Sequence, residues 1–590
     1  MGSSVSRVPE RNQPRTMKLT EIKIENFRGI RSLHLSLDKL TVLIGENNVG
    51  KSTVLEAIRL VLTRGFGGRR DARFTEYDFH LANDVAIPQM AEPISITLHF
   101  KEQKKDEWTD AITQQMNEVI QLDSDGLSNI WLQTRGTFQT DLGMFETKWL
   151  FLNEGGIELL LKNSTPLNLI SRLVPLFFLS ALRDVSQEFG SRGQFWSGFL
   201  KSIQLSDEQR EEVEKMLTEV NNAVIGANAG LAEVISKIAD ANHLVPLADA
   251  DPVVLEAIPT RVFDMVGKIQ VHLKSQYGAK LPLNRHGEGT QNLAVLMLFQ
   301  AFAATNLTET YTPESIPILA LEEPEAHLHP SAVRSLGSFL QNMTGQILVA
   351  SHSGDLVSQI PVTALRRLYK HNGETKIGQA PIGLLTDIEL QAIDYNIRLT
   401  KGYYLFSRGW LLVEGASDFH LMPLLMEVMG HSQDQISISV LEVSQVIDKG
   451  QPFMKLANAL GIPWLLMTDG DNAGNNYLAR TNQYTEQGFS EAVQLTNKNI
   501  EHEFWYNGFD GFIKSKVPDY RKKQIVHQAA GDQEEEARLM IKAAIEVAGG
   551  KPAFAHVLAD EVKNRGVSTI PQSLKNVINS VIKLTTENNV

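Results

Sequence analysis

Four acidic residues in the C-terminal half of the 590-residue chain follow apolar runs. The run "WLLV" ends at Glu414, with Asp418 shortly after, and the run "IPWLLMT" ends at Asp469 and Asp471. Both runs read as buried strands, and parallel strands bring their carboxyl ends to one edge of a sheet. Carboxylates gathered there repel one another unless divalent cations neutralise them, so the pattern predicts a metal site. The alternatives are an acidic turn at 469–471 and a first-turn helix charge at Asp418.

A second set of residues has the spacing of a phosphate-binding loop. The stretch "GENNVGKS", residues 45–52, fits G-x-x-x-x-G-K-[ST] between an apolar strand and an amphipathic helix. Glycines let backbone N–H groups approach phosphate oxygens, and the start of the helix favours negative charge. Lys51 is expected to reach the β and γ phosphates of ATP, and Ser52 to ligate Mg²⁺. The residues predicted to contact nucleotide are Gly45, Asn47, Asn48, Gly50, Lys51, Ser52 and Thr53.

Partner acids for this loop occur far downstream in "SIPILALEEPEAHLHP". An apolar strand over 316–321 ends at Glu322, placed to hold magnesium, and Glu323, placed to orient the attacking water. A further strand, "QILVASHS", ends at His352, which is expected near the γ phosphate. We assign His327 and His329 to structural hydrogen bonds rather than to a metal.

The elements that position these residues form an α/β chain of several domains. The formal net charge of −13 argues against a generally basic nucleic-acid coat and leaves room for a local basic groove. The absence of cysteine excludes disulfides and thiolate-ligated metal sites. No apolar run reaches the roughly 18 residues of a membrane span, so we expect a cytoplasmic protein without membrane contact.

The N-terminal motifs resemble the ABC-type ATPases of the RecF, Rad50 and SMC group. By that resemblance, Gly287, Gly289 and Gln291 in "RHGEGTQN" form a signature loop that completes the ATP site of a second subunit, which implies a homodimer or higher homo-oligomer. The loop departs from the usual Ser-Gly-Gly-Gln form, and the first partner acid is Glu322 rather than Asp. ATP binding is therefore expected, while the rate of hydrolysis stays open.

The C-terminal motifs resemble the TOPRIM fold of topoisomerases, primases and some nucleases, and Asp418 matches the acid that distinguishes the nuclease branch. An ABC-type head with a helical insertion before a TOPRIM domain resembles the OLD (overcoming lysogenization defect) family of nucleases. The resemblance implies that Glu501 and Glu503, facing one side of a strand in "NKNIEHEFWY", join the acids in holding two Mg²⁺ or Mn²⁺ ions. It also implies that Lys551 offsets the charge that develops on the phosphate.

The implied organisation is a disordered leader at 1–16, an ABC-type ATPase at 17–184 and 266–395, a helical dimerisation insertion at 185–265, and a TOPRIM domain at 396–590. In the insertion, "LSDEQREEVEKMLTEVNNAV" has a capping box at Ser206 and Gln209 and one apolar stripe. A basic loop with Arg64, Arg69, Arg70 and Arg73 could meet phosphates, although a solvated loop explains it as well.

The resemblance implies an ATP-binding and ATP-hydrolysing, divalent-metal-dependent DNA endonuclease, of a family that acts in defence against phage, in some members beside a helicase-like or reverse-transcriptase partner. The competing hypothesis is a nucleotide-controlled, DNA-sensing switch that binds metal and cuts nothing. The sequence leaves open the DNA form and sequence that are cut, and whether ATP activates or inhibits cleavage.

Overall fold

A computed structural model describes residues 17–63, 74–81, 86–161, 165–180, 206–227, 258–261, 272–274, 279–305, 312, 314–444 and 446–588. The predicted leader at 1–16, the predicted basic loop at 64–73 and most of the predicted insertion at 185–265 lie outside these residues.

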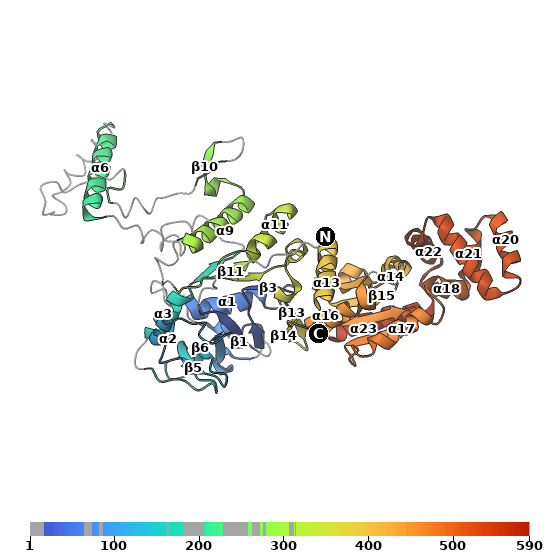
Figure 1. Ribbon diagram of the computed structural model, residues 1–590, viewed down its shortest axis with the longest axis horizontal. Coiled ribbons are helices and arrows are strands. Elements are labelled where there is room, and N and C mark those ends of the chain that lie inside the picture. The colour runs from blue at the N-terminus through green and yellow to red at the C-terminus, as the bar shows by residue number, and fades with distance from the viewer. Residues whose placement is uncertain are drawn as a thin grey trace, which may run out of the picture.

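An antiparallel sheet forms one layer of the N-terminal half (Figure 1). Its strand order is β2-β1-β4-β6-β5, with β7 also paired to β6. The strands are β1 (Leu19–Phe27), β2 (Ile30–Ser36), β4 (Ile94–Lys101), β5 (Gln121–Leu122), β6 (Ser128–Gln139) and β7 (Met144–Leu152). In β4 buried residues alternate with half-buried ones, as expected of a strand with one face on the core.

A second sheet carries the nucleotide motifs, in the order β14-β13-β3-β12-β11-β8. All neighbouring pairs are parallel except β13 with β14. The strands are β3 (Leu40–Ile44), β8 (Leu176–Leu179), β11 (Ile318–Glu322), β12 (Gln346–Ala350), β13 (Leu365–His371) and β14 (Glu374–Gln379). The strand predicted over 316–321 thus begins two residues later and includes Glu322.

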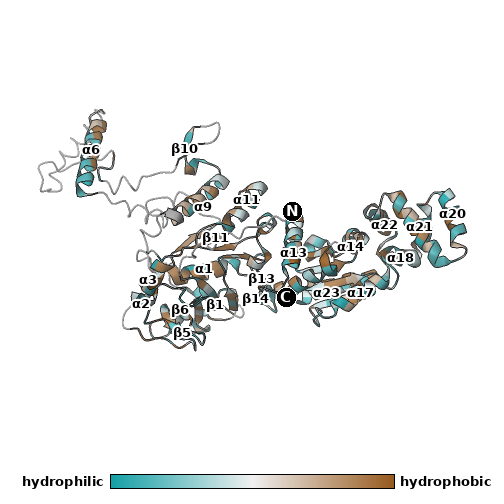
Figure 2. Cartoon of the chain, in the orientation of Figure 1, coloured by the Kyte–Doolittle hydropathy of each residue, from teal (hydrophilic) through white to brown (hydrophobic). Residues whose placement is uncertain are grey.

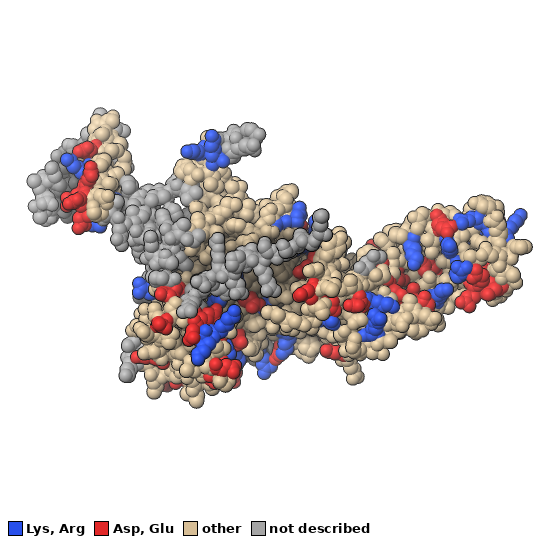
Figure 3. Space-filling model, in the orientation of Figure 1, with Lys and Arg blue, Asp and Glu red and all other residues tan. Residues whose placement is uncertain are grey.

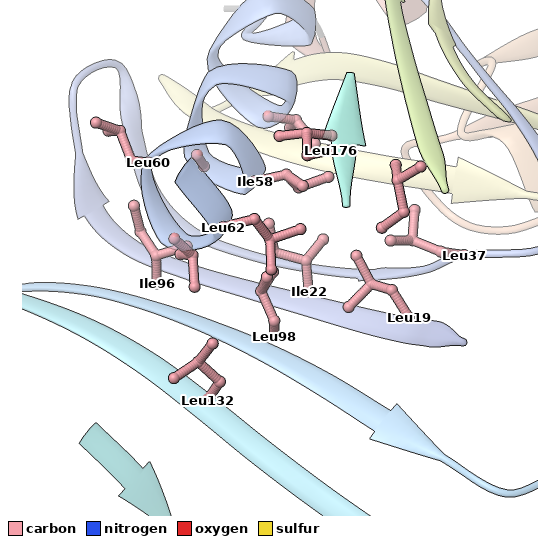
Figure 4. Close-up of a cluster of buried hydrophobic side chains, with 14 of the residues drawn as sticks. Leu19, Ile22, Leu37, Ile58, Leu60, Leu62, Ile96, Leu98, Leu132 and Leu176 are labelled. Carbon is pink, nitrogen blue, oxygen red and sulfur yellow. The ribbon is translucent and has the colours of Figure 1, made fainter. Parts of the chain in front are cut away.

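Helix α1 (Lys51–Leu62) connects the two sheets, because its side chains join one buried cluster with residues of both. Figure 4 shows Ile58 and Leu62 of α1 with Ile22, Ile96 and Leu98 of the antiparallel sheet. The sandwiched helix fixes the phosphate-binding loop between β3 and its own first turn. The N-terminal half further contains α2 (Asp110–Gln115), α3 (Thr165–Leu173), α9 (Glu288–Thr305), α11 (Pro330–Gln341), α12 (Gly354–Val357) and α13 (Asp387–Thr400), with the two-stranded sheet of β9 (His272–Lys274) and β10 (Lys280–Pro282).

The C-terminal half has its own parallel sheet, in the order β16-β15-β17-β18. Its strands are β15 (Gly409–Val413), β16 (Ile438–Glu442), β17 (Trp464–Thr468) and β18 (Ser490–Gln494). In β15 and β17 every residue is buried. In the hydropathy view of Figure 2, the helices of the C-terminal half combine teal and brown, as expected of helices with one face on the core. The helices are α14 (Ala416–Val428), α15 (Gln433–Ile436), α16 (Gln451–Leu460), α17 (Asn472–Thr481), α18 (Ile500–Phe504), α19 (Asp510–Ser515), α20 (Asp519–Ala529), α21 (Gln533–Ala548), α22 (Lys551–Arg565) and α23 (Gln572–Asn588).

The two halves share a hydrophobic core. One cluster runs from Val42 of β3 through α11 and α13 to Trp410 of β15 and Trp464 of β17. At the junction, the fully buried guanidinium of Arg367 donates to the carbonyls of Leu460, Gly461 and Ser407. The predicted α/β fold class is confirmed, with a larger N-terminal half followed by a smaller domain around a parallel sheet.

The described part of the insertion contains α6 (Asp207–Gly226), with the predicted capping box between Ser206 and Gln209. Its apolar side chains Met216, Val220 and Val224 are exposed. Within the described ranges, no helix is both long and apolar enough to cross a bilayer.

Candidate metal and nucleotide sites

The tips of β15 and β17 bring three of the predicted acids to one sheet edge. Glu414 follows the last residue of β15, and its Oε2 accepts a hydrogen bond from the backbone N–H of Asp469 at 3.1 Å. Asp471 caps α17, because its Oδ1 accepts from the N–H groups of Ala473 at 2.8 Å and Gly474 at 3.0 Å. The adjacent parallel strands therefore position these acids as the sequence pattern predicts.

A glycine is required where this acidic turn becomes a helix. A Cβ on Gly474 would lie 1.8 Å from the carbonyl oxygen of Asp469. No side chain fits at that distance, so Gly474 allows α17 to start directly beside the Asp469 backbone.

Two further carboxylates are buried under this edge. Asp418, in the first turn of α14, is 4% exposed, and its Oδ2 accepts from the N–H of Gly415 at 3.1 Å. Glu501 is 2% exposed and its Oε1 accepts from the hydroxyl of Ser417. Oδ1 of Asp418 and Oε2 of Glu501 have no hydrogen-bond partner among the atoms of the described residues.

The segment around Glu501 corrects one expectation. A strand that turns Glu501 and Glu503 to one side is wrong, because residues 500–504 form helix α18, capped by Asn499. Glu503 accepts from the N–H of Asn497 at 2.8 Å and from the hydroxyl of Ser573 at 2.9 Å. Both its oxygens are thus used in holding the chain before α18 against α23.

Three of the acids, Glu414, Asp418 and Asp469, have a raised pKa. Burial raises the pKa of Asp469 to about 7, and the charges of Glu414, Glu501 and Asp471 add to that effect, while Lys551 opposes it. Burial is also the main cause of the raised pKa of Asp418, with Asp469 and Glu501 contributing. The charge of Lys551, exposed at the first position of α22, opposes the raised pKa of both carboxyls. The cluster is therefore costly when fully ionised.

The chemistry of the donor set fits a divalent cation. The available ligands are carboxylate oxygens, and two of them are buried without a hydrogen-bond partner in the part of the chain that the structure describes. Carboxylate oxygens are the ligands that Mg²⁺ and Mn²⁺ prefer. Among the described residues, no three His, Asp or Glu side chains stand as a ready metal-binding group. Binding therefore requires some of the acids to turn toward the ion.

The predicted phosphate-binding loop lies between strand β3 and helix α1, the context that the sequence predicts. Lys51 is 5% exposed, and its amine donates to the carbonyls of Gly45 at 2.9 Å and Glu46 at 2.6 Å. Burial lowers the pKa of Lys51 to about 8, an effect that the charges of Glu323 and Glu46 oppose. Ser52 is exposed in the first turn of α1.

The predicted partner residues meet at the adjacent strand ends. Glu322 is the last residue of β11. Glu323 follows it, and its backbone N–H donates a hydrogen bond to the carbonyl of Ala350 at 2.9 Å. His352 follows β12, with its Nε2 3.9 Å from Oε1 of Glu323. Burial lowers the pKa of His352, and Lys51 lowers it further. The structure thus brings Lys51, Glu323 and His352 to one edge of the sheet.

The predicted signature loop lies beside the loop after β11. Glu288, between Gly287 and Gly289, pairs with His327 at 3.1 Å, and Asn292 donates to the carbonyl of Ala326 at 3.3 Å. Gln291 donates to the carbonyl of His286 at 2.6 Å. His329 caps α11 through Ser331, as its structural assignment predicts.

Three residues of these sites escape the sequence patterns. Ser417 holds Glu501, and Glu325 accepts from the Ser351 hydroxyl and from the His352 N–H at 3.1 Å. Arg408, directly before β15, donates to both carboxylate oxygens of Glu46 in the phosphate-binding loop. Ser417 lies between two acids in "EGASD", which is a weak signal, whereas no local pattern marks Arg408.

In comparisons with known proteins, different family profiles match the N-terminal and the C-terminal half of the chain. The family profile described as "Protein of unknown function (DUF2813)" matches residues 17–228 and 266–403, and the profile described as "Overcoming lysogenization defect protein-like, TOPRIM domain" matches residues 405–471. The chain is 26% identical to "Uncharacterized protein YbjD" of Escherichia coli (strain K12), over 96% of this chain and 99% of that protein.

Two relatives have names that state an activity. The "Old nuclease" of Escherichia phage P2 is 22% identical over 78% of each chain. The "Endonuclease GajA" of Bacillus cereus (strain VD045) is 22% identical over 87% of this chain and 85% of that protein.

Proposed function

The chain belongs to the family described as "Protein of unknown function (DUF2813)" and carries an OLD-like TOPRIM domain, and from this premise we propose that it is a divalent-metal-dependent DNA endonuclease with an ATP-binding head. The observation that carries the proposal is the group of buried carboxylates at the β15 and β17 tips, where Oδ1 of Asp418 and Oε2 of Glu501 have no hydrogen-bond partner within the described residues. We propose the head over 17–184 and 266–395, the insertion over 185–265 and the nuclease domain over 396–590.

In the proposed site, Glu414, Asp418, Asp469, Asp471 and Glu501 hold Mg²⁺ or Mn²⁺. A pair of such ions, when bound, stabilises both the attacking and the leaving oxygen of a phosphodiester displacement. Ser417 positions Glu501 through its hydroxyl. Lys551 faces the acids from α22 and offsets the charge that develops on the phosphate. Glu503 supports this arrangement by holding the chain before α18.

In the proposed head, the backbone N–H groups of residues 45–53 and the amine of Lys51 bind the ATP phosphates. Ser52 and Glu322 hold the accompanying Mg²⁺, Glu323 orients water, and His352 contacts the γ phosphate. The loop of Gly287, Gly289 and Gln291 completes the ATP site of a second copy of the chain, so the active assembly is at least a dimer.

The test is cleavage of supercoiled plasmid by the purified chain with Mg²⁺ or Mn²⁺, with and without ATP. Asp469→Ala is expected to lower the cutting rate by at least about 100-fold, because a metal ligand is lost. Asp560→Ala, which removes an exposed acid of α22, is the matched control and is expected to cut normally. Lys51→Ala is expected to abolish any effect of ATP on the rate.

One observation favours a second candidate, the nucleotide-controlled DNA-sensing switch: Arg408, directly before β15, pairs with Glu46 of the predicted phosphate-binding loop, and β15 leads on to Glu414. The switch predicts that wild-type protein leaves every plasmid form intact with either metal, while ATP still changes its affinity for DNA through Lys51. Metal-dependent cutting that Asp469→Ala removes would exclude the switch.

A role in defence against phage rests on the OLD resemblance alone. It predicts fewer plaques on bacteria that express the chain, and loss of this protection with Asp469→Ala.

A further inference from the structure

A lysine that no motif predicts lies at the carboxyl edge of the C-terminal sheet. After β16 the chain turns back toward α16 through a short turn, Ile447–Gly450. Asp448, Lys449 and Gly450 are all left-handed, with φ of 49°, 54° and 78°. Residues that carry a side chain rarely adopt this backbone conformation. Two consecutive non-glycine residues in it therefore need support from their surroundings.

The support comes from close packing. A Cβ on Gly450 would lie 2.6 Å from Cβ of Val443, so only glycine lets the turn close on the end of β16. The turn then directs Lys449 over the ring of Tyr477 on α17, with Nζ 4.5 Å from the ring centroid. Tyr477 is itself 6% exposed, which makes its ring a fixed platform for the amine.

The Lys449 amine lies close to the acids without pairing with one. Its charge opposes the raised pKa of Glu414. Burial and the charges of Glu414, Glu442 and Asp469 raise the pKa of Tyr477, whose ring lies beneath the amine. Nevertheless, none of the carboxylates in the described part of the chain forms an ion pair with Lys449. A half-buried cation held on an aromatic ring, and not by an acid, keeps its charge available to an anionic ligand.

Lys449 and Lys551 flank the acids from different elements. The charge of Lys551, on α22, opposes the raised pKa of Glu414, Asp418 and Asp469. The charge of Lys449, on the β16–α16 turn, opposes the raised pKa of Glu414. On the face drawn in Figure 3, Lys and Arg of the C-terminal half are interspersed with Asp and Glu. Recognition of a polyanion at this edge therefore depends on individual cations near the acids.

We propose that Lys449 binds a backbone phosphate of the DNA strand next to the phosphate that is cut, on the β16 side of the acids. This inference rests on the proposed nuclease function. It assigns Lys449 a positioning role, because the contact holds the strand in register and takes no part in bond cleavage.

The experiment compares wild type with Lys449→Ala, Lys449→Arg and the matched control Lys563→Ala. Lys563 is an exposed lysine of α22, about 18 Å along the helix from Lys551. With Mg²⁺ and a short DNA of defined sequence, Lys449→Ala is expected to raise KM about 5- to 30-fold with kcat within about twofold. Lys449→Arg restores most of the affinity, and Lys563→Ala is indistinguishable from wild type.

A set of DNAs that each carry one neutral methylphosphonate identifies the contact. In wild type, one position beside the cut is expected to raise KM, and in Lys449→Ala the same position no longer matters. Equal effects of every methylphosphonate in both proteins, or a fall in kcat with unchanged KM, would overturn the proposal.

Binding of the same DNA with Ca²⁺ in place of Mg²⁺ separates this proposal from the nuclease function. The salt dependence of the affinity is expected to weaken in Lys449→Ala by about 0.7 to 0.9 in the slope of log K against log salt. If wild type binds DNA with this difference but never cuts, the nuclease proposal fails and the Lys449 contact stands. If the slopes are equal, the Lys449 contact fails whether or not the protein cuts.

Discussion

At the scale of single residues, the ionised carboxylate of Asp469 at the β17 tip is expected to destabilise the fold that holds it. Asp469 has a pKa of about 7 against an ordinary value of 3.8, chiefly because it is buried. Between these two pH values the folded chain holds a proton that the unfolded chain has lost. The free energy of unfolding therefore falls as the pH rises through that window. Above about pH 7 the full cost of burying the ionised carboxylate is present.

Asp469→Asn removes this titration, so it is expected to stabilise the chain at pH 8 by about 1 to 2 kcal/mol without metal, and by less at pH 5. The measurement is thermal unfolding at both pH values in the presence of a chelator. Asp560→Asn, on the exposed face of α22, serves as the control. A gain that is the same at both pH values would show that the repulsion assigned to Asp469 is absent.

At the scale of elements, the buried strands of the C-terminal sheet are predictable from the sequence, whereas the short helix at residues 500–504 is not. The β15 and β17 tips are predictable because each strand is a fully buried apolar run that ends in acids. Residues 500–504 are not, since "IEHEF" alternates in polarity as a strand would, while Asn499 caps it as a helix. Ser417 and Lys449 act through contacts with residues distant in sequence, Glu501 and Tyr477, which no local periodicity encodes.

Helix α18 presents two buried glutamates with different hydrogen-bond partners, and we expect them to have different roles. Glu501→Gln is expected to lower metal-dependent cutting at least about 100-fold with little loss of stability, because a partnerless carboxylate oxygen is replaced. Glu503→Ala leaves the Asn497 N–H and the Ser573 hydroxyl without their acceptor, so it is expected to destabilise the fold by about 2 to 3 kcal/mol. Urea unfolding and plasmid cutting of both variants measure this contrast. The same profile for both variants would mean that the two residues share one role.

Helix α6 is rich in charged residues, and it exposes the apolar side chains of Met216, Val220 and Val224. We expect this stripe to pack against a second copy of the chain. Val220→Glu places a charge in that contact and is expected to shift the protein toward the monomer by at least about tenfold in dissociation constant. Sedimentation across a concentration series measures the shift, with Glu212→Gln on the same helix as the control. If Val220→Glu assembles as wild type does, another surface forms the dimer.

At the scale of the whole molecule, the two halves are connected in two different ways. The shared core and the buried Arg367 join β13 to the C-terminal sheet, so the halves are expected to unfold together. The second connection is short and partly exposed: Glu46 of the predicted phosphate-binding loop accepts two hydrogen bonds from the Arg408 guanidinium, one of them at 2.9 Å. From Arg408 the buried strand β15 leads directly to Glu414. A single strand thus connects a residue that contacts the nucleotide loop to a predicted metal ligand.

Breaking this ion pair is expected to change regulation more than stability. Both side chains are partly exposed, 45% for Arg408 and 36% for Glu46, and such pairs contribute only about 0 to 1 kcal/mol. Arg408→Ala and Glu46→Gln are therefore expected to unfold near the wild-type temperature, while the ratio of cutting rates with and without ATP moves toward one. The double variant should equal either single variant, since both remove the same contact. Arg521→Ala, which breaks the exposed pair with Glu546, is the control. Unchanged ratios in both single variants would mean that nucleotide reaches the acids through the shared core instead.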